Sequence, residues 1–143
     1  MKRIISFLVL LTIATGIYAC MGNSSSSPNF TSSMVPEKKV EVFYFHFTRR
    51  CMTCNNVEKV SKEAVENLFA EQVKKGEISF KSVNLDEKEG EAIGAKYKIE
   101  GQTLIVISGN KRADLTEKGF MYANDKPEKL KAEIKKAIDG MIK

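Results

Sequence analysis

The chain has 143 residues, of which 43% are hydrophobic and 29% are charged. These values are ordinary for a globular protein, and the length suits one folded domain with a short extension. The formal net charge is +5, and because this small charge is spread along the chain it gives no reason to expect a nucleic-acid partner.

The first 19 residues have the pattern of a signal peptide. A short basic start leads into an apolar run over residues 4–17, which is too short for a transmembrane helix of about 20 apolar residues. The run ends in Ala19, a small residue that suits cleavage by a signal peptidase, and Cys20 follows directly. This ending resembles the bacterial lipoprotein box, although Tyr18 is bulky for its position. We expect Cys20 to be lipidated; the alternative is ordinary secretion with a free Cys20.

Residues 20–37 are predicted to form a lipid-anchored, flexible linker. They are rich in Ser and Asn and include Pro28 and Pro36, so they cannot bury enough apolar surface to offset the entropy lost on ordering. A lipid on Cys20 holds the domain that follows at a membrane. The sequence therefore predicts a membrane lipoprotein on the periplasmic side of a bacterial cell envelope, with a monomeric domain over residues 38–143.

Regular patterns fill the predicted domain. Residues 40–47 are β-branched and aromatic and are apolar on both faces, as a central buried strand should be. After a turn, apolar residues recur at three- and four-residue steps, which predicts one helix that ends at Gly76. A strand over 78–85, a short helix over 88–97 and an apolar strand over 104–107 follow.

The last third of the domain adds a hairpin and a helix. Gly109-Asn110 predicts a tight turn into a strand over 112–115. Asp125 is predicted to cap the final helix, with Pro127 in its first turn. The residues that this helix is expected to bury are Leu130, Ile134, Ala137, Ile138 and Met141. Strands separated by helices are expected to run parallel, so the pattern predicts an α/β fold: a four-stranded mixed sheet with helices on both faces.

Cys51 and Cys54 lie after the predicted first strand, where the predicted first helix begins. Amides at a helix N-terminus lack partners and carry a partial positive charge, which lowers the pKa of a thiol placed there. Arg49 and Arg50 are expected to add to this effect. The pattern favours thiol–disulfide chemistry, in which Cys51 forms a mixed disulfide with a partner protein and Cys54 resolves it.

The Cys51–Cys54 pair has other interpretations. A structural zinc site needs four ligands, and His46 is the only histidine in the chain. A disulfide between residues so close in sequence constrains the unfolded chain little, so a purely structural bond is unfavourable. His46 itself is favoured as a satisfied polar residue at a strand end. The second functional hypothesis is a binding module in which Cys51 and Cys54 hold a soft metal or arsenite without redox turnover.

The domain resembles the thioredoxin-like superfamily over about 105 residues. The similarity lies in the Cys-X-X-Cys helix start, the VNLD run at 83–86 and the YKIEG run at 97–101. It implies a three-layer sandwich and a thiol–disulfide oxidoreductase without a cofactor or a metal. More narrowly, FHFTRRCMTC at 45–54 is similar to the exported bacterial proteins of the nitrophenyl compound nitroreductase subunit ArsF family.

Departures from the thioredoxin pattern bear on the expected mechanism. Thioredoxins have a cis-proline before the third strand, where this chain has Gly101-Gln102-Thr103, so a cis peptide bond is not expected here. The tryptophan before the cysteines is replaced by Arg50, and the buried aspartate by Phe45. These differences favour one specific partner over general reduction of disulfides.

Overall fold

The structure is a computed structural model that describes residues 39–143. The signal peptide, the linker and the lipidation predicted at Cys20 lie outside these residues. The helices and strands in chain order are β1 (Val40–His46), α1 (Met52–Leu68), α2 (Ala70–Lys74), β2 (Ile78–Asn84), α3 (Lys88–Tyr97), β3 (Thr103–Ser108), β4 (Lys111–Asp114), α4 (Thr116–Tyr122) and α5 (Pro127–Ile142). None of the helices in this part of the chain is both long enough and apolar enough to cross a membrane.

The four strands form one mixed sheet in the order β2-β1-β3-β4. As predicted, β1 is a central strand: it pairs in parallel with β2 and in antiparallel with β3, and it is buried along nearly its whole length. The predicted hairpin is also confirmed, because β3 and β4 pair in antiparallel with Ser108 opposite Lys111. Gly109 adopts a φ of +57°, a backbone conformation that residues other than glycine rarely adopt.

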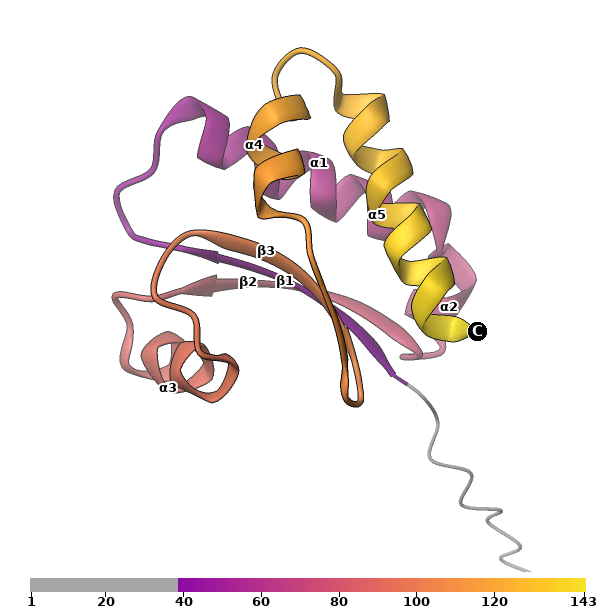
Figure 1. Ribbon diagram of the computed structural model, residues 1–143, viewed down its shortest axis with the longest axis horizontal. Coiled ribbons are helices and arrows are strands. Elements are labelled where there is room, and N and C mark those ends of the chain that lie inside the picture. The colour runs from indigo at the N-terminus through magenta and orange to yellow at the C-terminus, as the bar shows by residue number, and fades with distance from the viewer. Residues whose placement is uncertain (1–38) are drawn as a thin grey trace, which may run out of the picture. The chain divides into compact units, whose positions relative to one another are not determined.

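The direction of β3 corrects the sequence prediction. Strands separated by helices were expected to run parallel, yet β3 runs antiparallel to β1 and therefore to β2. The reason is the length and position of α3, which has ten residues and extends only about 15 Å. It lies near the end of the sheet at which β2 finishes, so the chain re-enters the sheet from that same end (Figure 1).

Two hydrophobic cores lie on opposite faces of the sheet. The larger one packs α1, α4 and α5 against one face, where Val42, Tyr44, Leu104, Ile134 and Ile138 are fully buried (Figure 1). The smaller one joins Phe43, Phe45, Val83, Ile105 and Ile107 under α3. The arrangement is the α/β three-layer sandwich of the thioredoxin-like fold, as the sequence predicted.

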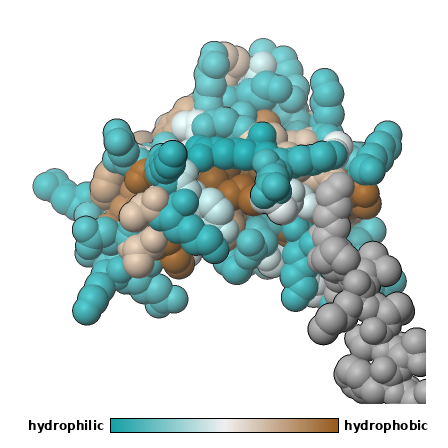
Figure 2. Space-filling view, turned by 60° about the horizontal axis from the view of Figure 1, so that its bottom comes forward, coloured by the Kyte–Doolittle hydropathy of each residue, from teal (hydrophilic) through white to brown (hydrophobic). Residues whose placement is uncertain are grey.

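Long side chains help α3 to cover the smaller core. Figure 2 turns this side of the molecule forward and shows hydrophobic residues in the middle of the face, surrounded by hydrophilic ones. The ammonium group of Lys81 lies 5.3 Å from the centre of the Phe43 ring, and it also pairs with Glu41 at 2.6 Å. A cation over an aromatic face is favourable, and the alkyl stem shields apolar surface from water.

Three local features differ from the sequence prediction. The first helix was expected to continue to Gly76, but it breaks at Phe69 (φ −129°, ψ 31°), whose ring is buried in the core. Helix α4 was not predicted, because Gly119 interrupts its pattern; a Cβ there would lie 3.2 Å from Val57 of α1. Asp125 does not cap α5: the cap position belongs to Lys126, which makes no side-chain cap bond, while Pro127 does occupy the first turn.

Candidate active site at the start of α1

Cys51 is the N-cap residue of α1 and is exposed to solvent. Its backbone is extended (φ −80°, ψ 169°), which turns the sulfur back over the first turn of the helix. There the sulfur accepts a hydrogen bond from the backbone N–H of Cys54 at 3.3 Å. One of the unpartnered amides of the helix start is thus satisfied by a sulfur, as it would be by the oxygen of an ordinary N-cap residue.

Cys54 lies one turn further along and is 3% exposed. Its thiol donates a hydrogen bond to Oε1 of Gln102 at 3.0 Å. Gln102 comes just before β3, in the segment where thioredoxins have their cis-proline; no cis peptide bond occurs within residues 39–143. Sequence reasoning did not identify Gln102 as part of the site. Its only signal was a polar residue in place of that proline.

The two thiols have opposite electrostatic environments. When the Cys54 thiol donates to the Cys51 sulfur in place of Gln102, this hydrogen bond, followed by the one from the Cys54 backbone N–H, lowers the pKa of Cys51 below its ordinary value. Burial, followed by the same thiol contact, raises the pKa of Cys54. As pH rises, Cys51 therefore loses its proton first, and it does so while Cys54 remains a thiol.

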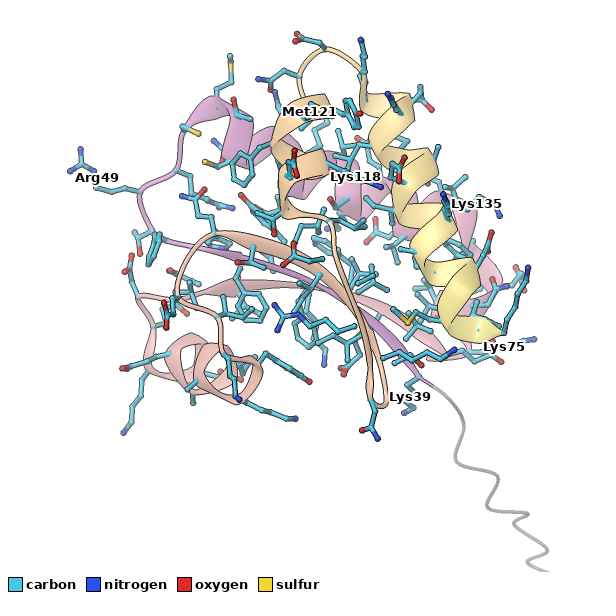
Figure 3. All side chains as sticks on the ribbon, in the orientation of Figure 1. Lys39, Arg49, Lys75, Lys118, Met121 and Lys135 are labelled. Atoms are coloured by element: carbon cyan, nitrogen blue, oxygen red, sulfur yellow. The ribbon has the colours of Figure 1, made fainter. Side chains whose placement is uncertain are left out.

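The two arginines before the pair do not act as predicted. Arg50 forms an ion pair with Glu58, which lies one turn beyond Cys54 on α1. Arg49 extends away from the domain into solvent (Figure 3). The lowered pKa of Cys51 follows from hydrogen bonds around the helix start, and the prediction that neighbouring guanidinium groups assist it is not supported by this geometry.

Tyr44 is a second residue of this region that sequence reasoning missed. It is fully buried on the face of β1 that packs against α1, and its hydroxyl has no hydrogen-bond partner among the described residues. Burial raises its pKa above the ordinary value, and the negative forms of Cys54 and Glu58 act in the same direction. Tyr44 therefore stays a neutral phenol beneath the cysteine pair.

His46 ends β1 and is buried. Its Nδ1 lies 2.9 Å from the carbonyl oxygen of Phe47 and donates a hydrogen bond to it. This is the satisfied strand-end role that the sequence favoured. Across residues 39–143, no three His, Cys, Asp or Glu side chains gather in a group suited to a metal ion.

Two sets of hydrogen bonds brace the loop and the helix start. On one side, the backbone N–H of Thr48 donates to Asp86 at 2.7 Å, and the Asn84 amide donates to the Thr48 hydroxyl at 3.0 Å. The bond from Thr48 lowers the pKa of Asp86. On the other side, Asn124 joins Asn56 and Thr53 of α1, each at 2.9 Å. The VNLD run thus supports the reactive loop through its Asn and Asp.

The difference between the thiols predicts selective alkylation. At pH 7, iodoacetamide is expected to modify Cys51 on the order of tenfold faster than Cys54, because Cys51 is exposed and each unit of pKa changes the thiolate fraction about tenfold. Peptide mass mapping of the reduced protein after short exposures measures both rates. Equal rates at the two positions would contradict the assignment of Cys51 as the reactive thiol.

A hollow of the described domain lies away from the cysteine pair. It has a volume of about 600 Å³ and lies between β4 and α5, where its lining includes Lys111, Leu115, Lys136 and Met141. None of the residues from the cysteine loop or from the segment before β3 lines it. Its basic residues are partly neutralised, since Lys118 pairs with Glu133 across the hollow.

In comparisons with known proteins, the chain matches solved structures but no protein family. No protein-family model matches the chain, and no curated protein matches it. A malarial protein is similar at 23% identity over 69% of this chain and 97% of that one, with a TM-score of 0.46. The germline-specific thioredoxin Deadhead of Drosophila melanogaster matches at 21% identity over 69% and 81%, with a TM-score of 0.43. A thioredoxin of Fasciola hepatica matches at 21% over 71% and 84%, with a TM-score of 0.39.

Proposed function

We propose that the protein is a thiol–disulfide oxidoreductase that exchanges electrons with a specific partner protein through Cys51 and Cys54. The observation that carries the proposal is the pairing of an exposed thiol of lowered pKa with a buried thiol of raised pKa, one helical turn apart. Such an arrangement separates the attacking role from the resolving role. The structure has both cysteines as free thiols, so it represents the dithiol form.

The thiol–disulfide exchange takes place in two steps. In the reducing direction the Cys51 thiolate attacks one sulfur of a partner disulfide; a new S–S bond forms, the old one breaks, and the departing sulfur takes a proton from solvent. Cys54 then gives up its proton and attacks the Cys51 sulfur, which releases the partner as a second thiol. Two electrons have passed to the partner, and Cys51 and Cys54 are joined. The oxidising direction runs through the same mixed disulfide in reverse.

The surface around Cys51 favours a protein as the partner. Met52, the residue after Cys51, is 74% exposed, and Thr48 and Arg49 before it are exposed as well. An exposed apolar side chain beside a reactive thiol supplies contact area for a partner, since methionine adapts readily to irregular surfaces. Arg49 adds a positive charge, which suits an acidic surface on the partner protein.

The setting of this exchange is proposed from the N-terminal sequence alone. The signal-peptide pattern and the cysteine that follows Ala19 support lipidation at Cys20 and attachment to a membrane of the cell envelope. The similarity of residues 45–54 to the ArsF family is compatible with this setting, because that family is exported.

The proposal is tested by counting thiols. The protein is equilibrated with oxidised or with reduced glutathione, alkylated, and weighed by mass spectrometry. We expect Cys51 and Cys54 to be modified after reduction and protected after oxidation, with the disulfide reopened by fresh reductant. A thiol count that is the same under both conditions would contradict the proposed redox function. Binding of arsenite by that unreactive pair would then support the metalloid-binding alternative.

A further inference from the structure

Gln102 is the one side chain outside the cysteine motif that is hydrogen bonded to a site thiol within residues 39–143. It comes from a segment 48 residues beyond Cys54, and its Oε1 lies 3.0 Å from the Cys54 sulfur. The amide is partly buried, so water competes weakly for its oxygen. Because Cys54 carries a single thiol proton, Gln102 and the Cys51 sulfur are alternative acceptors for it.

We infer that Gln102 is a positioning residue that stabilises the dithiol form of the pair over the disulfide form. The inference rests on the proposed function and deepens it. The hydrogen bond requires a proton on Cys54, and a disulfide has none. When Cys51 and Cys54 join, Gln102 loses its donor while remaining partly buried, so this contact favours only the dithiol.

A preference for the dithiol biases the direction of exchange. It makes the Cys51–Cys54 disulfide a better electron acceptor, which favours oxidation of dithiols of a partner protein. In that direction two electrons and two protons pass from the partner to the pair, and the partner gains a disulfide. One of the protons ends on Cys54, where Gln102 accepts its hydrogen bond. The other protonates the Cys51 thiolate or passes to solvent.

Two substitutions of opposite effect test the inference. Gln102→Leu removes the acceptor, so the equilibrium constant with glutathione is expected to shift about fivefold toward the disulfide. Gln102→Glu keeps an acceptor of nearly the same shape and adds a negative charge, so it is expected to shift the constant toward the dithiol by at least a similar factor. Gln72→Leu, in α2, repeats the first change at the only other glutamine of the chain and should leave the constant unchanged.

The outcomes separate the two hypotheses. Opposite shifts for the two Gln102 variants, with Gln72→Leu at the wild-type value, support the inference. If the wild-type protein cycles but Gln102→Leu stays within about twofold of it, or if both Gln102 variants shift in one direction, the inference is wrong and the proposed function stands. If the wild-type protein forms no disulfide at any glutathione ratio, the proposed function itself fails. Circular dichroism of each variant establishes that it is folded.

Discussion

Changing Cys54 to Ser should turn a protein that releases its partner into one that remains covalently joined to it. Cys51 is exposed and has a lowered pKa, so the first exchange step is intact in this variant. The second step is lost, because a serine hydroxyl does not displace a sulfur from a disulfide. Resolution by a positioned intramolecular thiol is very much faster than attack by thiols in solution, so the mixed disulfide is expected to persist roughly 10³-fold longer.

The measurement is a non-reducing gel of cells that express the full-length variant, followed by identification of the adduct that disappears on reduction. Cys51→Ser is the matched control, since it makes the same change at the other cysteine and should give little or no adduct. Equal trapping by both variants would overturn the assignment of roles. The absence of any adduct, in cells where the wild-type pair cycles, would redirect the search toward small-molecule substrates.

Replacing Gly90 with Ala should be strongly destabilising, although alanine is the better helix former. A Cβ at this position of α3 would lie 1.8 Å from the carbonyl oxygen of Asn84 and 2.6 Å from its carbonyl carbon. Both atoms are backbone at the end of β2, so the helix must move away from the sheet. We expect a loss of about 3 kcal/mol in the free energy of unfolding, measured with urea.

Gly140 supplies the matched control, because it also lies in a helix and a Cβ there would meet no atom within 4 Å. Gly140→Ala is expected to leave stability unchanged or to raise it by about 0.5 kcal/mol. Two variants of equal stability would show that α3 does not approach β2 as closely as described. Since Asn84 also bonds to Thr48, Gly90→Ala should loosen the cysteine loop as well.

The sequence predicted those features of the fold that depend on local patterns. The apolar run of β1, the hairpin at Gly109-Asn110 and the Cys-X-X-Cys start of α1 each depend on neighbouring residues, and each is found in the structure. The direction of β3 was missed because it depends on where α3 lies in space. Helix α4 was missed because Gly119, which weakens a helical pattern, is needed for close packing on α1.

The site was predictable only in part for the same reason. The positions of Cys51 and Cys54 on the helix follow from their spacing, but the acceptor for the buried thiol comes from a residue 48 positions away. Arg50 was expected to act on Cys51 because it is adjacent in sequence, whereas its ion pair with Glu58 is set by the first turns of α1. Charged neighbours in sequence thus predicted the wrong partner, because long side chains reach whichever opposite charge the fold brings near.

The central strand β1 also determines where the cysteine pair lies relative to the start of the domain. The chain enters the domain at Val40 and reaches the cysteine loop only after the full length of β1, so the two lie at opposite ends of the strand (Figure 1). Seven residues of extended chain span about 20 Å. An attachment through the segment before Val40 therefore joins the domain at the end remote from Cys51.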